Sequence, residues 1–430
     1  MTGRERLHAI LNRQPIDRLS WTTLVDDVTR AGMPAEVRKL SPFDFYRHIG
    51  CDILQFGNYG LSAGEAVLSP SRLTCTEMTC ELETEKDGKL TRHQIPGANV
   101  TFGIGAETVT GRAVLKRKTP WGTLATTLEN DHPVDYPVRS LEDMRILRSI
   151  WEASDYVEQE GMEASFACTE RLIGDDGLYV PTVDPSPVQS LLEYEMGVEN
   201  FYYLFADYPE EMKSLLAAMH AKRLKEYEIL ARRSPAEVVI AVENTSSAMI
   251  SPEIYRALSL PQIRDYVEVL HAHGKRAVLH MCGHIRELLE PIRETGLDGI
   301  NAATPPPIGN TSCEDVLDFF GDDFLLFGAV FDPSVLHKAD VSSAELQDHL
   351  TRLYTPRLRR ANLVLWLAVD GLTTPLQRFL AVGQWMRGEG DGSGQPASLS
   401  ASAYADTTSS FAKATEDRPA DKPPRQGSSG

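Results

Sequence analysis

Eight short apolar segments alternate with amphipathic segments along the chain, and this alternation constrains the fold more than any other feature. The short segments are rich in β-branched and aromatic residues, as buried strands are. The stretches between them show apolar residues at helical spacing. Strands that alternate with helices form parallel sheets, and eight such units predict an α/β fold, the (β/α)8 TIM barrel. The predicted strands span residues 19–24, 52–57, 178–183, 237–242, 276–282, 298–303, 324–331 and 363–369.

The connection between the second and third predicted strands is too long for a single crossover helix. Residues 66–140 alternate polar and apolar residues and contain KDGK, a hairpin-turn sequence. We therefore expect a β-rich subdomain inserted into a barrel that spans residues 1–387. Residues 388–430 are rich in Gly, Ser, Ala, Pro and Asp but poor in large apolar residues. This composition predicts a disordered tail.

The net charge and composition exclude some classes of binding partner and indicate a cellular location. The formal net charge of the 430-residue chain is −18, which would repel nucleic acid and anionic membranes. The sequence has no apolar run of about 18 residues, as a membrane span would need, and its charged start does not resemble a signal peptide. Six cysteines are too sparse for a disulfide framework. We therefore expect a cytoplasmic protein that binds neither nucleic acid nor membranes.

His280 and Cys282 lie two residues apart at the end of a predicted strand, in the sequence VLHMCGH. Side chains two apart on a strand point to the same side, and barrel active sites lie at the C-terminal ends of the strands. Imidazole and thiolate groups are zinc ligands, and a catalytic zinc takes three protein ligands and leaves one position open. The alternative is a buried histidine bonded to the backbone beside an inert core cysteine.

Acidic residues follow several other predicted strands and are candidates for a third ligand or a catalytic group. The alternative for each is a capping role at the start of the next helix. Asp26 and Asp27 form a further candidate pair after the first strand. Adjacent residues of an extended chain point in opposite directions, so we expect at least one of the two to be solvated. The acidic residues after the later strands are Asp184, Glu243, Asp332 and Asp370.

Three other cysteines are weaker candidates for chemistry. Cys313 lies at a predicted helix start and could reach the barrel mouth, although residues at helix starts usually face solvent. Cys75 and Cys80, in the inserted segment, do not have the spacing of a zinc knuckle, so we expect them to be structural or exposed. The sequence contains neither GxGxxG nor a Walker loop, so dinucleotide and P-loop chemistry are not indicated.

The order of several segments resembles the uroporphyrinogen decarboxylase superfamily. The opening helix with its P-x-D-R sequence and first strand, the TPWGTL turn and the block around VLHMCGH are similar to segments of that superfamily. The blocks FGAVFDPSVL and NLVLWLAVDGLTTPLQRF follow in the same order. The resemblance covers residues 1–387 and implies a TIM barrel.

Two branches of this superfamily differ at the site. The decarboxylases carry an Arg-rich first loop of the type R-Q-A-G-R-Y, which binds the carboxylates of the porphyrinogen, and they use no metal. Here the loop reads WTTLVDDVTRAGMP, and its acidic residues would repel a polycarboxylate. The zinc methyltransferases that act with corrinoid proteins are similar to this chain at H-x-C-G. Those that alkylate thiols have a third cysteine ligand in the last-strand block, which here contains Asp370 instead.

The resemblance implies a methyltransferase that uses zinc and a partner protein carrying a corrinoid, with a small methylated substrate. It implies His280 and Cys282 as zinc ligands, and we expect Asp370, or else Glu243, as the third. An oxygen ligand would make the zinc a stronger Lewis acid and favour ether or amine demethylation. The candidate catalytic carboxylates are Glu243, Asp26 and Asp27. The alternative functions are a uroporphyrinogen decarboxylase and a barrel that binds a tetrapyrrole or small ligand without turnover.

Overall fold

The structure of the protein is a computed structural model of the 430-residue chain. It describes the backbone throughout except at residues 87–88, 96–110, 131, 332–334, 337–340, 370 and 391–430. Two expectations from the sequence therefore fall outside the described residues. They are the disordered tail, apart from its first three residues, and the positions of Asp332 and Asp370. No described helix is long and apolar enough to cross a membrane.

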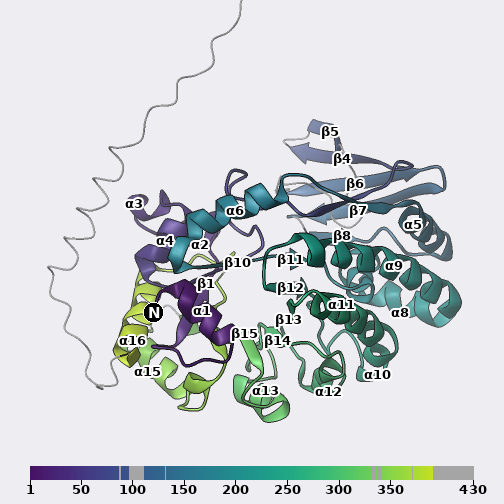
Figure 1. Ribbon diagram of the computed structural model, residues 1–430. Helices are drawn as coiled ribbons and strands as arrows, with labels where there is room; N and C mark the ends of the chain where they lie inside the picture. Colours follow the sequence, from purple (N-terminus) through teal and green to yellow (C-terminus); the bar gives the residue numbers. More distant parts are fainter. Residues whose placement is uncertain are drawn as a thin grey trace, which may run out of the picture.

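Eight parallel strand positions surround a common axis, as predicted for a TIM barrel (Figure 1). Seven of them form one continuous sheet, β1-β16-β15-β14-β13-β12-β11, and β2 pairs with β10. β10 and β11 are one strand position interrupted at Pro181. The strands are β1 (Ser20–Thr23), β2 (Ile53–Phe56), β10 (Gly177–Val180), β11 (Thr182–Val183), β12 (Val238–Val242), β13 (Arg276–His280), β14 (Gly299–Asn301), β15 (Leu325–Phe331) and β16 (Leu363–Leu367).

The first and second strands do not form a regular ladder, but they are joined by individual hydrogen bonds. The backbone N–H of Asp52 donates to the carbonyl of Trp21 at 2.9 Å, and the N–H of Leu54 donates to Oγ1 of Thr22 at 3.3 Å. These bonds link β1 to β2 where the two sheets meet. Together with the β1–β16 and β2–β10 pairings, they connect the strands around the axis.

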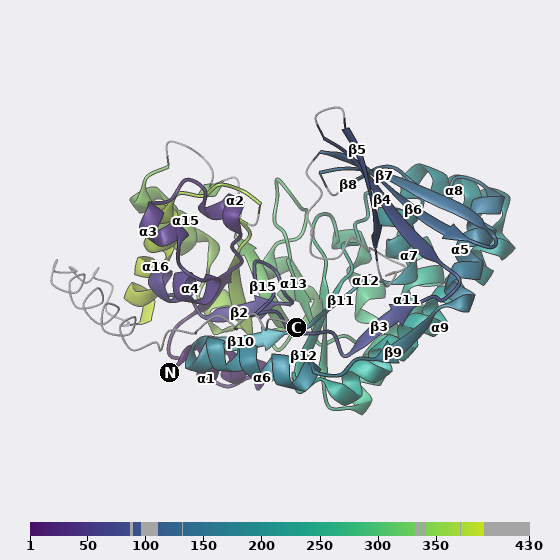
Figure 2. The ribbon, with the colours of Figure 1, turned by 90° about the horizontal axis from the view of Figure 1, so that it is seen from above.

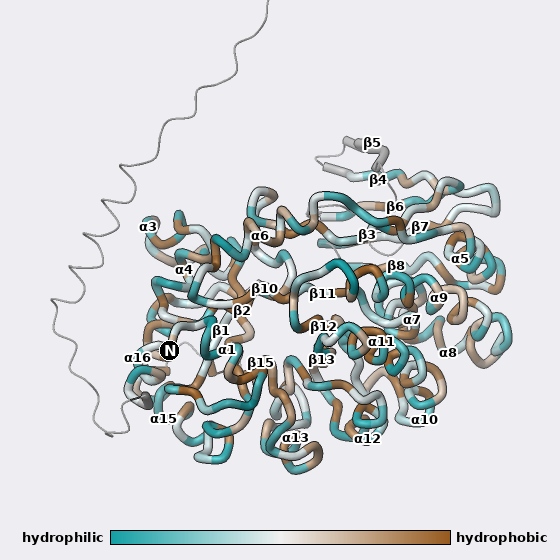
Figure 3. Tube along the Cα trace, in the orientation of Figure 1, coloured by the Kyte–Doolittle hydropathy of each residue, from teal (hydrophilic) through white to brown (hydrophobic). Residues whose placement is uncertain are grey.

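Alternate residues of each strand face the barrel interior and the surrounding helices, as the period of a strand requires. In β13, Val278 belongs to the interior cluster, whereas Ala277 and Leu279 belong to the cluster between strands and helices. Figure 3 shows hydrophobic residues along β10 and β15, in the centre of the molecule. This alternation decides which polar residues at the strand ends can meet at the mouth.

Helix α1 (Gly3–Leu11) closes the end of the barrel at which the strands begin. Leu7, Ile10 and Leu11 are buried in the interior cluster. Asn12, directly after the helix, accepts a hydrogen bond from Arg276, the first residue of β13. The opposite end, where the strands finish, is therefore the one that can admit a substrate.

The connection between β2 and β10 carries the predicted β-rich insertion, and it is longer than residues 66–140. It contains a five-stranded antiparallel sheet in the order β5-β4-β6-β7-β8. A further pair, β3 (Ser71–Thr74) with β9 (Asp155–Glu158), extends the inserted region beyond residue 140. The five strands are β4 (Thr79–Lys86), β5 (Lys89–Ile95), β6 (Arg112–Thr119), β7 (Gly122–Glu129) and β8 (His132–Asp135).

The antiparallel sheet lies at one side of the barrel, next to α5 and α8 (Figure 2). A buried ion pair joins it to the barrel. Arg117 of β6 donates through both terminal nitrogens to Glu195, at 2.8 and 2.5 Å, and both side chains are about 5% exposed. Glu195 ends the π-helical turn η2 (Leu191–Glu195). This bidentate ion pair attaches the inserted sheet to the segment that follows β11.

The helices around the strands follow the predicted pattern, with one exception that bears on the site. After β13, α12 spans only Leu289–Arg293 and follows a 3-10 turn at Arg286–Leu288, so no helix begins directly after Cys282. The remaining helices are α2 (Asp27–Arg30), α3 (Ala35–Arg38), α4 (Pro42–Ile49), α5 (Leu141–Ala153), α6 (Met162–Ile173), α7 (Pro187–Ser190), α8 (Gly197–Asp207), α9 (Pro209–Arg233), α10 (Pro252–Ile254), α11 (Leu260–Ala272), α13 (Cys313–Phe320), α15 (Ser343–Leu353) and α16 (Leu376–Gly390).

Candidate functional site

His280 is the last residue of β13, and its ring lies on the interior side of the strand. The ring packs against the indole of Trp366 on β16, with 5.8 Å between the ring centroids. Trp366 belongs to the interior cluster. The neighbours Leu279 and Met281 are buried on the other side, in the outer cluster. The strand therefore directs His280 into the barrel near the C-terminal end of its strands.

A buried asparagine fixes the protonation of this histidine. Asn301 on β14 pairs in register with His280, and its Nδ2 donates to the carbonyl of Phe327 at 2.5 Å. That bond assigns the other amide atom, Oδ1, to the side facing Nδ1 of His280, 2.5 Å away. An amide oxygen can only accept, so Nδ1 carries a proton, and in the neutral imidazole Nε2 carries the lone pair.

The close approach of Asn301 depends on Gly328 in β15. Gly328 has a φ of +134°, and a Cβ at this position would lie 2.1 Å from Nδ2 of Asn301. Only glycine leaves this space and accepts this backbone conformation. The sequence signal for Asn301 is a polar residue inside the apolar strand segment DGINAA, but the sequence analysis did not select it as a site residue.

Cys282 lies two residues beyond His280 and is exposed. Its thiol donates to Oδ1 of Asn244 at 3.7 Å. Asn244 follows β12 and has a φ of +45°, a conformation that asparagine tolerates. Its Nδ2 donates to both carboxylate oxygens of Glu193, at 3.2 and 3.4 Å. The sequence analysis missed Asn244 and Glu193, which come to the mouth from separate segments.

Glu193 is a carboxylate held by neutral donors. Besides Asn244, it accepts hydrogen bonds from the hydroxyl of Tyr194 and from Nε2 of Gln189 at 3.0 Å. The charge of Glu193, together with burial, raises the pKa of the Tyr194 hydroxyl. Tyr194 is therefore a neutral hydrogen-bond donor at physiological pH. Polar groups from two segments, after β11 and after β12, thus lie beside Cys282.

Glu243 does not join this group. Its carboxylate accepts hydrogen bonds from the N–H and Oγ of Ser186, at 2.8 and 2.6 Å, and from Oγ1 of Thr245 at 3.2 Å. It is 1% exposed and borders a small cavity between β12, β13 and helix α11. Burial raises the pKa of Glu243 to about 7, although these hydrogen bonds oppose the shift.

Asp26 and Asp27 have separate environments, as expected for adjacent residues. Asp26 caps α2, accepting from Thr29, and its other oxygen accepts from the Tyr59 hydroxyl at 2.5 Å and from the Gly371 N–H at 3.1 Å. Burial raises the pKa of Asp26, but these hydrogen bonds outweigh it and hold the pKa below its usual value. The Asp27 side chain is fully exposed and lies 3.4 Å from Arg30.

Within the described residues, no group of three or more His, Cys, Asp or Glu side chains is close enough together to hold a metal ion. The Glu243 carboxylate is instead bound to Ser186. Asp184 instead lies 3.5 Å from the buried Arg223. The remaining candidate, Asp370, lies outside the described residues.

The other cysteines are core residues rather than ligands. Cys313 begins α13 but is buried, so the expectation that it faces solvent is wrong. Burial raises the pKa of its thiol to about 12. Cys75 and Cys80 are also buried, which agrees with a structural role for this pair.

The sequence profile of one family matches the chain at residues 186–358, which include β12 to β14 and His280. The family is described as Uroporphyrinogen decarboxylase (URO-D). The match is confined to these residues, which are less than half of the chain. The resemblance to this superfamily and the TIM-barrel expectation are thereby confirmed.

Solved structures add a comparison of the fold. A methyltransferase from Methanosarcina mazei aligns over 91% of this chain and 99% of its own, with a TM-score of 0.50 and 14% identity. At this identity the likeness shows the fold. Two D-psicose 3-epimerases, one of them from Clostridium cellulolyticum H10, align over 48% of this chain and 69% of theirs. Their TM-scores of 0.31 and 0.29, at 11% and 10% identity, are too low to bear on fold or function. No curated protein sequence matches the chain.

Proposed function

We propose that this protein is a cytoplasmic methyltransferase that moves a methyl group between a small methylated compound and a corrinoid protein. The compound would be a methoxy ether, a methylated amine or a methylated thiol, and a zinc ion would be bound at the barrel mouth. One observation carries the proposal. His280 presents a lone pair on Nε2 because Asn301 holds the proton on Nδ1, and Cys282 lies two residues further along the same chain segment.

The donor set fits zinc in its chemistry. Zinc-binding histidines commonly donate their second ring N–H to an oxygen acceptor, and this contact fixes the ring orientation. Asn301 supplies that acceptor here, and Trp366 packs against the same ring. Nε2 of His280 and Sγ of Cys282 would hold the ion. The fold of the Methanosarcina mazei methyltransferase, shared over most of both chains, also supports this function.

Asp370 is the third ligand that we propose, from its place in the sequence. Val364, Trp366 and Ala368 alternate into the interior cluster, and position 370 continues this alternation along the sequence. Gly371, the next residue, donates its N–H to Asp26, which caps α2 after β1. The last-strand segment therefore returns to the mouth directly after position 370.

The residues of the chain would bind and orient the substrate, while the partner's corrinoid would supply the methyl acceptor or donor. A zinc ion bound here would act as a Lewis acid on the heteroatom that carries the methyl group. Asn301 keeps the His280 proton on Nδ1. The Asn244 amide, itself held by Glu193, places a polar group next to the Cys282 sulfur. Tyr194 and Gln189 satisfy Glu193, so its position at the mouth is fixed.

Elemental analysis of the purified full chain tests the metal. We expect about one zinc per chain in the wild type and a loss of zinc in Cys282→Ala. The matched control is Cys168→Ala, which removes a half-buried thiol on α6. Free cob(I)alamin then serves as a methyl acceptor, with methoxylated aromatics and methylamines as donors. Zinc-free wild type after reconstitution, or zinc retained in Cys282→Ala, would contradict the proposal.

The matching family profile makes uroporphyrinogen decarboxylation the second candidate activity. The loop after β1 contains one basic residue, Arg30. Its guanidinium is buried and donates to the Leu40 carbonyl at 2.7 Å, while Asp27 is exposed beside it. This arrangement leaves an acidic loop in the place where a polycarboxylate would need cations. We therefore expect no conversion of uroporphyrinogen to coproporphyrinogen, as measured by porphyrin fluorescence after oxidation. Clear turnover would replace the methyltransferase proposal.

A further inference from the structure

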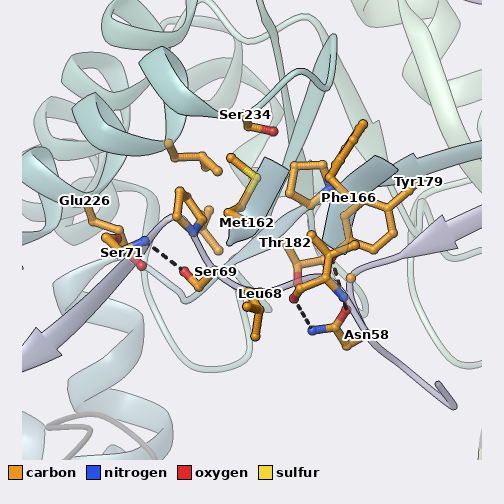
Figure 4. A pocket seen from close by; sticks show the side chains of 16 residues that line it. Asn58, Leu68, Ser69, Ser71, Met162, Phe166, Tyr179, Thr182, Glu226 and Ser234 are labelled. Atoms are coloured by element: carbon orange, nitrogen blue, oxygen red, sulfur yellow. Dashed lines mark hydrogen bonds between the residues drawn. The ribbon is translucent and has the colours of Figure 1, made fainter. Parts of the chain in front are cut away.

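A pocket lies in the barrel wall, separate from the residues around His280 and Cys282. It is bounded by the β10–β11 strand position, by helices α6 and α9, and by the segment that leads into β3 (Figure 4). None of its lining residues takes part in the polar group at the mouth. The pocket therefore requires an explanation of its own.

One end of the pocket is polar. Ser71 and Glu226 lie next to each other there (Figure 4). Ser71 is 4% exposed, and its hydroxyl oxygen has no hydrogen-bond partner among the described residues. A buried hydroxyl without a partner is unfavourable, and a bound ligand would remove this penalty by bonding to it. Glu226 is the single charged residue among those that line the pocket.

Behind this end, one buried guanidinium contacts two carboxylates. Arg223 is 1% exposed, and its NH1 lies 2.5 Å from Oε2 of Glu226 and 3.5 Å from Oδ2 of Asp184. The hydroxyl of Tyr156 accepts from the same nitrogen at 3.0 Å. Arg223 thus holds the Glu226 carboxylate in place at this end of the pocket. Burial and the charge of Asp184 raise the pKa of Glu226, although Arg223 opposes this.

The other end of the pocket is apolar and aromatic. Phe166 of α6 and Tyr179 of β10 meet edge to face, with 5.7 Å between their centroids and an interplanar angle of 87°. Met162 and Leu230 also line the pocket. The Tyr179 hydroxyl is already engaged with Asn58 at 3.3 Å. This end therefore offers packing surface for a compact apolar group.

We propose that this pocket binds a small organic ammonium compound. Its ammonium group bonds to the Glu226 carboxylate and the Ser71 hydroxyl, and its apolar body packs against Phe166 and Tyr179. An ammonium group donates several hydrogen bonds, so it can satisfy the Ser71 hydroxyl and at the same time form a charge-assisted hydrogen bond to the Glu226 carboxylate. The site joins β3 of the inserted region to α9 of the barrel, so its ligand bridges the two. It does not depend on the proposed methyl transfer, because the two sites share no residue.

Calorimetric titration of the full chain with benzylammonium tests the proposal, with benzyl alcohol as the neutral probe of similar shape. We expect wild type to bind benzylammonium at least about tenfold more tightly than benzyl alcohol, the ratio that one charge-assisted hydrogen bond can supply. Glu226→Gln abolishes this preference. Glu290→Gln, which removes an exposed carboxylate paired with Arg256, leaves it unchanged. Equal binding of the two probes, no binding by wild type, or an unchanged preference in Glu226→Gln overturns the proposal.

A second variant keeps the test decisive if Glu226→Gln fails to fold. Leu68 lines the pocket and is 44% exposed, so a larger side chain is tolerated at this rim position. Leu68→Trp fills the pocket and is expected to weaken benzylammonium binding at least about tenfold. The control is Val198→Trp, at an exposed position on α8. Unchanged binding in Leu68→Trp places the probe elsewhere and overturns the proposal.

Discussion

Asn301 and His280 form a hydrogen bond of 2.5 Å whose direction is fixed by a third group, the carbonyl of Phe327. The amide cannot rotate to present its nitrogen to the histidine without losing its bond to that carbonyl. The imidazole is therefore held in one tautomer before any ligand arrives. Because the tautomer is already set, no free energy is needed to change it when a metal binds.

Replacing Asn301 should weaken zinc binding without removing a ligand. In Asn301→Ala the Nδ1 proton loses its acceptor, so we expect zinc affinity to fall by about 10- to 100-fold. Asn301→Asp keeps an acceptor for Nδ1 and should retain more affinity than the alanine variant. Competition with a colorimetric chelator, on protein shown by circular dichroism to be folded, measures this.

The control for that experiment is Asn362→Ala. The side chain of Asn362 also donates a hydrogen bond to a backbone carbonyl, that of Asp323, at 3.0 Å. Asn362 lies directly before β16, at the opposite end of the strands from His280. Its loss should leave zinc affinity unchanged. Equal affinities for wild type and Asn301→Ala would show that Asn301 does not orient a zinc ligand.

Glu243 should make the protein less stable as the pH rises from about 4.5 to 7. Its folded pKa of about 7 lies above the ordinary value of 4.5, so the folded state binds more protons than the unfolded state in this window. Stability therefore falls with rising pH. A shift of this size corresponds to about 3 kcal/mol between the two ends of the window.

Glu243→Gln isolates this effect. Glutamine can accept from the Ser186 N–H and donate to a hydroxyl, as the protonated acid does, but it cannot ionise. Denaturant unfolding at pH 5 and at pH 7.5 should show a smaller loss of stability for the variant than for wild type. Glu199→Gln, at an exposed position on α8, should behave as wild type. Identical pH dependence in Glu243→Gln and wild type would assign the pH effect to other groups.

Breaking the Arg117–Glu195 pair should destabilise the protein more than removing both partners. Arg117→Met leaves the Glu195 carboxylate buried without its cation, which costs about 3–5 kcal/mol in comparable buried pairs. The double variant Arg117→Met with Glu195→Met leaves no buried charge, so we expect a smaller loss. Chemical unfolding of the three proteins measures the free energies of unfolding. A double variant as unstable as Arg117→Met, or more so, would contradict the expectation.

The barrel and its strands follow from local patterns in the sequence. Each of the eight predicted segments contains an observed strand, because apolar β-branched runs and helical periodicity are local patterns that survive folding unchanged. The same period placed His280 on the interior side of its strand, which ends before Cys282, and separated Asp26 from Asp27. The inserted β-rich region was also predicted, although its extent to Glu158 was not, since the β3–β9 pairing joins residues far apart in the chain.

The partners of these residues could not be predicted from local sequence. Glu243 follows its strand as a mouth residue would, but it meets Ser186 in the layer between strands and helices. Asn301 contacts His280 because the parallel register of β13 and β14 places the two residues opposite each other. Gly328 has no side chain and so leaves space for the Asn301 amide. Asn244 and Glu193 meet beside Cys282 from two different strand ends. Such contacts depend on register, backbone conformation and helix placement, and these are set by packing across the barrel rather than by local sequence.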